Sequence, residues 1–254
     1  MRWKCTCAYD GTEFCGWQSQ ANKQAIQDVL EAQIAQIFKR FVRIHGSSRT
    51  DAGVHARAQV FHFDADWIHG EDCLLKAINS RLPTSIKIVK VEAVDELFHA
   101  RFSGKGKRYC YYFQLHPATP FNARYIWHVP NKNLDIECMQ SAAKLFLGTH
   151  DFRGFAGKVL PGENTVKILS NIHIISGQDS FVLSISGSGY LYRMVRMIMG
   201  ALTMCGMHKI TPEFITERLA LKQLQIPIVT APPHGLFLEE IFYNPVSQKS
   251  SSRV

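Results

Sequence analysis

Hydrophobic side chains in the first half of the chain follow two patterns, one suited to strands and one to helices. Alternating or β-branched runs predict strands over residues 3–9, 41–46, 57–64 and 86–94. Recurrence every three to four positions predicts helices over residues 24–40 and 71–81. The predicted order of elements in this half is therefore βαββαβ.

The second half shows the same two patterns in the same order. Strands are predicted over residues 107–115, 166–174, 181–185 and 235–242, and helices over residues 134–147 and 190–205, with a further short helix over residues 212–221. In the helix at 190–205, Arg196 lies on the flank of the apolar stripe, whereas Arg193 lies nearly opposite it and is expected to be solvated.

Two such halves predict an α+β fold. We expect two ferredoxin-like (RRM-like) βαββαβ halves that share one extended antiparallel sheet, with helices on one face and a cleft between the halves. The expected boundaries are residues 1–104 and 105–245, followed by a disordered tail at residues 246–254 that is rich in serine. This order of elements also occurs in unrelated enzymes, so it does not by itself fix a function.

The charge of the chain points to a polyanionic partner. The 254 residues include 29 Lys and Arg against 21 Asp and Glu, which gives a formal net charge of +8. Basic side chains bind nucleic acids by displacing counterions from the phosphates, so RNA or DNA is the favoured partner class.

Cysteine usage and hydrophobicity favour a cytoplasmic protein. The seven cysteines form no Cys-x-x-Cys pair, which argues against a disulfide framework and a zinc ribbon and predicts reduced thiols. No secretory signal is evident, and the apolar stretch at residues 191–207 is short and interrupted by Arg193 and Arg196. We therefore expect no association with a membrane.

A loop of small residues between two predicted strands carries the most unusual chemistry. Residues 46–56, GSSRTDAGVHA, expose Asp51 beside Arg49, His55 and Arg57. A purely structural alternative is a tight turn in which Asp51 binds backbone amides and Gly53 supplies a positive φ. A phosphate-binding P-loop is absent from the sequence, and SGSGY at residues 186–190 lacks the third glycine of a dinucleotide fingerprint.

Seven short motifs, in order along the chain, resemble those of the tRNA pseudouridine synthase A family. They are YDGTEFCGWQ (9–18), RTDAGVHA (49–56), FHARF (98–102), KRY (107–109), GTHDF (148–152), LYRMVR (191–196) and GLFL (235–238). The resemblance implies that the enzyme isomerises uridine to pseudouridine at positions 38, 39 and 40 in the anticodon stem-loop of tRNA. It also implies a homodimer that uses no metal, no nucleotide and no other cofactor. In each chain, the active site is expected between the N-terminal and C-terminal halves.

The resemblance assigns catalytic roles to three residues. Asp51 corresponds to the catalytic carboxylate, Arg196 to its arginine partner, and Tyr109 to the tyrosine that stacks on the target base and takes part in removing the C5 proton. Three routes for Asp51 remain open: attack on C1′, attack on C6 of the uracil, or removal of the C2′ proton.

The resemblance and the charge together suggest residues that bind the substrate. Arg49 corresponds to the arginine that fills the space left by the flipped uridine. Further candidates for phosphate contacts are basic residues near the motifs: Lys105, Lys107, Arg108, Arg101, Arg153 and Lys158.

Two other functions fit parts of the sequence. The first is an acyl-transfer hydrolase built from Ser47 or Ser48, His55 and Asp51, although triads usually draw on separated segments. The second is a non-catalytic RNA-binding protein on a ferredoxin-like sheet, which accounts for the charge but gives Asp51 no role.

Overall fold

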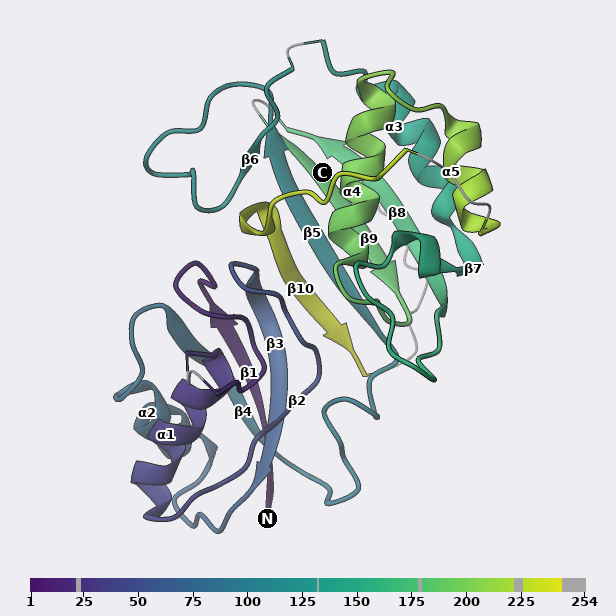
Figure 1. The fold of residues 1–254 in the computed structure, drawn as a ribbon. Coiled ribbons are helices and arrows are strands. Elements are labelled where there is room, and N and C mark those ends of the chain that lie inside the picture. Colours follow the sequence, from purple (N-terminus) through teal and green to yellow (C-terminus); the bar gives the residue numbers. More distant parts are fainter. Residues whose placement is uncertain (22–23, 132, 178–179, 222–225, 244–254) are drawn as a thin grey trace.

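In the computed structural model, the described residues are 1–21, 24–131, 133–177, 180–221 and 226–243, and their strands form one ten-stranded sheet (Figure 1). The first half contributes six elements, which are β1 (Arg2–Tyr9), α1 (Ile26–Phe38), β2 (His45–Gly46), β3 (His55–Asp64), α2 (Glu71–Asn79) and β4 (Ile86–Val94). Every second residue of β1 is buried, as the alternation predicted. The order β4-β1-β3, with β2 paired to β3, is the ferredoxin-like order.

The second half repeats this arrangement with insertions. Its main elements are β5 (Gly106–Gln114), α3 (Ile136–Ala143), β8 (Val166–Ser176), β9 (Phe181–Gly187), α4 (Met194–Gly206), α5 (Pro212–Leu219) and β10 (Leu236–Phe242). Short additions are β6 (Trp127–His128), η1 (Lys144–Phe146), β7 (Gly148–Asp151), η2 (Phe152–Phe155) and η3 (Pro233–Gly235). The strand order β10-β5-β9-β8 matches that of the first half, and β7 extends the edge.

The two halves join through β3 and β10. These strands are parallel and pair at Phe237 with His55 and at Leu238 with Ala56, whereas the other neighbours along the main path of the sheet are antiparallel. The predicted α+β fold with one extended sheet is confirmed, but the expectation of an entirely antiparallel sheet is wrong at this junction. Alternation identifies a strand but not its direction, so the sequence did not reveal the parallel pair.

The helices of both halves lie on the same face of the sheet. In the first half, Phe63 of β3 packs edge-on against Phe38 of α1. In the second half, the hydroxyl of Tyr111 on β5 donates to the carbonyl of Pro232. The N–H of the preceding residue, Ala231, donates to the carbonyl of Arg196 in α4, so this face of β5 also lies toward a helix. The site described below lies on this helix-covered face, between the two helical layers.

Two predicted elements begin well after the residue that the pattern indicated. The strand expected over residues 41–46 is reduced to β2, because only His45 and Gly46 pair with β3 before the chain leaves the sheet. The helix expected from residue 190 begins at Met194, because Arg193 adopts a left-handed φ of 60° that ends helical geometry.

Helix α4 is buried along its whole length, so it lacks the polar face that its predicted stripe implied. Its outer side is covered by residues 226–231, and a Cβ on Gly200 would lie 1.7 Å from the carbonyl oxygen of Val229. This cover is what buries Arg196.

Among the described residues, no helix is both long enough and apolar enough to cross a bilayer. The predicted disordered tail at residues 246–254 lies outside the described residues.

Candidate active site

Two strands of the first half fix the loop that carries Asp51. Gln59 of β3 is fully buried, and its side-chain amide binds both backbone groups of Ser48, donating to the carbonyl at 2.7 Å and accepting from the N–H at 3.2 Å. The hydroxyl of Tyr9 on β1 lies 2.8 Å from Oγ1 of Thr50. A buried side-chain amide with both of its groups paired is a rigid support, so the loop is held in one conformation.

The motif at residues 9–18 packs directly against this loop. A Cβ on Gly11 would lie 2.0 Å from the carbonyl oxygen of Val54, and one on Gly16, whose φ is +88°, would lie 2.5 Å from that of Thr50. The N–H of Trp17 donates to the same Thr50 carbonyl at 3.1 Å. Glycine is required at both positions because the two backbones approach so closely.

Asp51 forms an ion pair with Arg196 across the boundary between the halves. Nη1 of Arg196 donates to Oδ2 of Asp51 at 2.9 Å, and the side chains are only 11% and 19% exposed for Arg196 and Asp51. Nε of the same guanidinium donates to the carbonyl of Ala231 at 2.8 Å. The backbone segment that packs over α4 thus fixes the guanidinium through Nε, while Nη1 binds the carboxylate.

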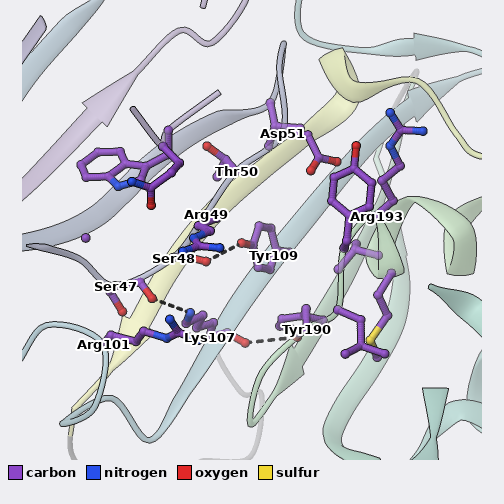
Figure 2. A pocket seen from close by; sticks show the side chains of 18 of the residues that line it. Ser47, Ser48, Arg49, Thr50, Asp51, Arg101, Lys107, Tyr109, Tyr190 and Arg193 are labelled. Carbon is purple, nitrogen blue, oxygen red and sulfur yellow. Dashed lines mark hydrogen bonds between the residues drawn. The ribbon is translucent and has the colours of Figure 1, made fainter. Parts of the chain in front are cut away.

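Tyr109 of β5 lies beside this pair. Its hydroxyl is 2.9 Å from Oγ of Ser48, and its ring packs edge-on against Tyr190 with centroids 5.1 Å apart (Figure 2). Burial raises the pKa of Tyr109 to about 12, an effect that Ser48 opposes and Asp51 reinforces. The phenol therefore keeps its proton at neutral pH.

These residues line a cavity of about 810 Å³. This volume lies within the range of about 300–1,000 Å³ that is typical of small-molecule sites. Nine charged residues line the cavity, seven cations and two anions: Arg43, Arg49, Arg101, Lys107, Lys158, Arg193 and Arg196, with Asp51 and Glu163. A positive cavity with one carboxylate next to a guanidinium suits an anionic ligand and an acid or base reaction.

Lys107 links the two halves at the other end of the cavity (Figure 2). Its Nζ donates to the carbonyl of Ser47 at 2.8 Å. Burial, together with the nearby charge of Arg101, lowers the pKa of Lys107 to about 8.

Comparison with known proteins identifies the family. A family model described as tRNA pseudouridine synthase matches residues 6–103 and 142–244. The chain belongs to the tRNA pseudouridine synthase family. Similar proteins include tRNA pseudouridine synthase A 2 of Clostridium perfringens, 40% identical over 94% of this chain and 98% of that protein. Another is tRNA pseudouridine synthase A of Bacillus subtilis, 38% identical over 96% of this chain and all of that protein.

Among solved structures, one chain from a crystal structure of a Cbf5-Nop10-Gar1 complex aligns with 78% of this chain and 44% of its own length. The TM-score is 0.37 at 10% sequence identity, too distant to bear on fold or function. The family assignment therefore rests on the sequence comparisons, and it confirms the resemblance seen in the motifs.

Most of the site residues expected from the sequence line the same cavity. The cavity brings together Asp51, Arg196, Tyr109, Arg49, Lys107, Arg101 and Lys158. Lys105 and Arg153 are not among its lining residues. Arg108 points to the opposite face of β5, where its Nη2 lies 2.8 Å from Oε2 of Glu240. Alternation along β5 separates Arg108 from Lys107 and Tyr109, a signal already present in the sequence.

Sequence reasoning missed two cations of the cavity. Arg193, expected to be solvated only, is exposed but also lines the cavity, because it precedes α4 instead of lying within it. Arg43 lies in the segment expected to be a strand, and its guanidinium packs over Phe41 with 4.9 Å to the ring centroid. Arg43 lies outside the seven motifs, and Arg193, although it lies in the motif at residues 191–196, was assigned to the solvated face of the predicted helix.

The hydrolase alternative does not fit the position of His55. This side chain is fully buried; its Nδ1 accepts from the N–H of Gly11 at 3.0 Å and its Nε2 lies 2.9 Å from the carbonyl of Arg124. Burial lowers the pKa of His55, which keeps it neutral. Both ring nitrogens are occupied by backbone groups, so His55 cannot serve as the base of a triad.

Proposed function

We propose that this protein isomerises uridine to pseudouridine at positions 38, 39 and 40 in the anticodon stem-loop of tRNA. The observation that carries the proposal is the Asp51–Arg196 ion pair inside a cavity whose charged lining residues are mostly cations. Membership of the tRNA pseudouridine synthase family supports the reaction, and the seven motifs support the anticodon stem-loop as the target. By the same resemblance we propose a homodimer in the cytoplasm.

The reaction moves the glycosidic bond from one uracil atom to another. The N1–C1′ bond breaks, the uracil turns, a C5–C1′ bond forms, and the proton on C5 leaves while N1 gains one. The sum of atoms does not change, so the step consumes no water, phosphate or redox equivalent. A carboxylate held close to the ribose is the group that this chemistry requires.

In this proposal Asp51 acts on the ribose or the uracil, and Arg196 holds it in position. The ion pair is largely screened from water, and its partner guanidinium is fixed by Ala231, so the carboxylate is pre-organised before substrate arrives. All three routes for Asp51 need an ionised carboxylate close to the bond between the ribose and the uracil.

Tyr109 supplies a flat surface for the uracil in this proposal. Because its pKa is raised to about 12, the neutral hydroxyl can take up the C5 proton only by passing its own proton on, and Ser48 is the neighbour at 2.9 Å that could accept it. The ring can stack on a base whichever way that proton leaves.

Three cations of the cavity are proposed to contact the RNA: Arg49 and Arg101, which are exposed, and Lys107, which is half-buried. Arg49 is exposed and lies two residues before Asp51, which suits the role of filling the space of a flipped uridine. Arg101 and Lys107 lie further along the cavity and are proposed to contact phosphates. Arg108, which is paired to Glu240 on the other face, is not part of this set.

We also propose that residues 1–104 and 105–245 act as two halves that each complete the site. The first supplies Asp51 and Arg49, and the second supplies Arg196, Tyr109 and Lys107. Three of the contacts that cross the boundary lie in the cavity: the Asp51–Arg196 pair, the Ser48–Tyr109 hydrogen bond and the Lys107–Ser47 hydrogen bond.

The test uses unmodified tRNA transcribed with tritium at C5 of uracil. The protein should release tritium, and mapping of the product should place pseudouridine at positions 38–40. Tight tRNA binding without tritium release would instead favour a non-catalytic RNA-binding protein. Release from other uridines would retain the reaction but refute the proposed target.

A further inference from the structure

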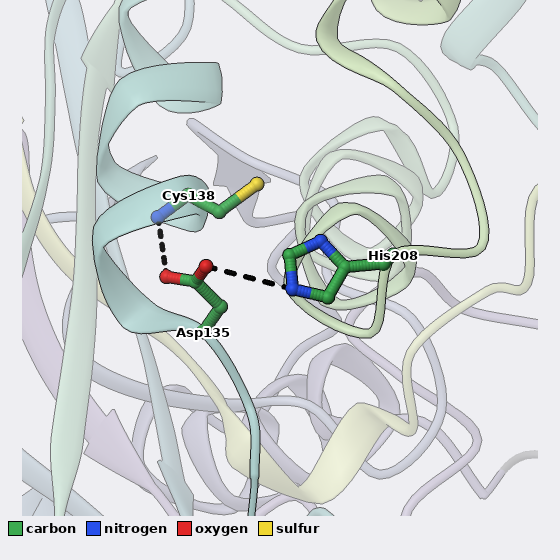
Figure 3. Close-up of side chains that lie close together, drawn as sticks. All are labelled: Asp135, Cys138 and His208. Carbon is green, nitrogen blue, oxygen red and sulfur yellow. Dashed lines mark hydrogen bonds and ion pairs between the residues drawn. The ribbon is translucent and has the colours of Figure 1, made fainter.

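A second cluster of reactive side chains lies away from the active-site cavity, where the start of α3 meets the end of α4 (Figure 3). One ligand atom each from Asp135, Cys138 and His208 lie within 4.8 Å of one another. A fourth group is adjacent, because Sγ of Cys205 lies 3.3 Å from Sγ of Cys138. The sequence places them as two pairs with the same spacing, Asp-x-x-Cys and Cys-x-x-His.

The side chains of Asp135, Cys138 and His208 point toward one another (Figure 3). Oδ1 of Asp135, the N-cap residue of α3, accepts from the N–H of Cys138 at 2.8 Å. Its other oxygen, Oδ2, lies 3.6 Å from Nε2 of His208. One oxygen of the carboxylate is thereby fixed, and the other faces the imidazole of His208.

The backbone around the cluster is closely packed. The backbone N–H of Asp135 donates to the carbonyl of Gly206 at 2.9 Å, and the backbone N–H of His208 donates to the carbonyl of Cys205 at 2.8 Å. A Cβ on Gly206 would lie 2.9 Å from the carbonyl oxygen of Asp135 and 2.7 Å from Cγ of Met139. The two helix ends are therefore held in contact before any ligand binds.

We propose that Asp135, Cys138, Cys205 and His208 bind one Zn²⁺ ion at this contact between α3 and α4. Zinc–sulfur bonds of about 2.3 Å and zinc–nitrogen or zinc–oxygen bonds of about 2.0–2.1 Å place tetrahedral ligands about 3.3–3.8 Å apart. The nitrogen–oxygen separation of 3.6 Å is within about 0.3 Å of a tetrahedral N–O edge, and the sulfur–sulfur separation of 3.3 Å is about 0.5 Å shorter than an S–S edge, so the two thiols would move slightly apart as the ion binds. As the two Zn–S bonds form, two thiol protons pass to solvent.

The position in the fold assigns the ion a structural role. None of the four residues lines the active-site cavity. Arg196, which holds Asp51, lies nine residues before Cys205 on the same helix, a distance of about 14 Å along its axis. The ion would fix the far end of α4 against α3 and so stabilise the helix that carries Arg196, without entering the reaction.

The test titrates the metal-free full-length chain, kept reduced by a phosphine, with Zn²⁺ and, as a spectroscopic probe, Co²⁺. We expect one ion per chain, a higher Tm with Zn²⁺, and charge-transfer absorption from thiolate to Co²⁺. Loss of a residue that only contacts a metal ligand lowers metal affinity by roughly 10- to 100-fold. Cys138→Ser and His208→Ala remove ligands, so each should lower the affinity for Zn²⁺ by more than this. Cys73→Ser, which removes an exposed thiol on α2, should bind as wild type does.

Two results would overturn the proposal. One is the absence of saturable binding to the reduced chain, and the other is binding that survives in both ligand variants. A third measurement identifies the alternative. If the reduced chain binds no ion, and mild oxidation removes two free thiols from wild type but not from Cys138→Ser, then Cys138 and Cys205 form a redox-active disulfide and not a metal site. All three results leave the proposed isomerase activity untouched, because tritium release is measured separately.

Discussion

Replacing Arg196 with lysine tests the ion pair while it preserves the positive charge. The guanidinium makes two directed hydrogen bonds, from Nη1 to Asp51 at 2.9 Å and from Nε to Ala231 at 2.8 Å. A lysine has one nitrogen and cannot reproduce this fork, so Arg196→Lys must give up one bond or misplace the other.

The size of the effect follows from the bond that is lost. A hydrogen bond to a charged group contributes about 1.5–3 kcal/mol. If that contribution is needed to hold Asp51 in its reactive position, the isomerisation step should slow by about 10- to 150-fold. Affinity for tRNA should change by less than about threefold, because the side chain of Arg196 is only 11% exposed and makes internal contacts, whereas affinity depends on cations that reach phosphates.

The assay separates these two effects. Single-turnover tritium release, with protein in excess over labelled tRNA, measures the isomerisation step, and filter binding at fixed salt measures Kd. Arg193→Lys is the matched control, because Arg193 lines the same cavity and has no hydrogen bond to Asp51 among those of the described residues; it should leave the rate within about threefold of wild type. A normal rate combined with weakened binding in Arg196→Lys would mean that Arg196 contacts phosphate, and would refute this reasoning.

Three further predictions concern other parts of the site and its support. Tyr109→Leu should slow turnover at least about tenfold by removing the stacking surface, while Tyr109→Phe should retain more activity; equal losses would show that the hydroxyl takes part in removing the C5 proton. Burial and two neighbouring histidines lower the pKa of His62 from 6.5 to about 4. Unfolding monitored against pH should therefore show stability falling by at most about 3 kcal/mol as pH drops from 6.5 to 4, a loss that His62→Asn removes; an unchanged pH profile would contradict this cause. Gly11→Ala should lower the free energy of unfolding in urea by about 1–3 kcal/mol, because its Cβ would lie 2.0 Å from the Val54 carbonyl; wild-type stability would show that the loop yields easily.

The parts of the fold that the sequence predicted are those set by local pattern. Alternation located β1, β3, β8 and β9, and helical spacing located α1 and α3, because each element buries one face. The bounds of α4 could not be read in this way. It is buried on all sides, and its start is set by the backbone conformation of Arg193, not by hydrophobic spacing.

The pattern of hydrophobic positions does not predict contacts between segments that are far apart in the sequence. The parallel pairing of β3 with β10, and the cover of α4 by residues 226–231, depend on how the two halves pack. The short strands β6 and β7 are fixed by neighbours along the sheet and carry little signal of their own.

The site residues were predicted through motifs, and the structure explains why motifs were needed. Asp51 and Arg196 are 145 positions apart, and no periodicity links them. Arg108 shows the limit of this approach, since a motif places it beside Tyr109 while the alternation of β5 turns it to the other face. Gly11 and Gly16 lie in a motif because the backbone of the Asp51 loop leaves no room for a Cβ.

The central claim is that the carboxylate of Asp51 performs the chemistry while other residues hold the RNA. The most direct test compares wild type with Asp51→Asn, which keeps the size of the side chain and an oxygen that can accept from Arg196, but removes the charge. Single-turnover tritium release and tRNA affinity are measured on the same preparations. We expect tritium release to be lost and Kd to stay within about threefold of wild type, because phosphate contacts dominate affinity. Sustained pseudouridine formation by Asp51→Asn would contradict the account.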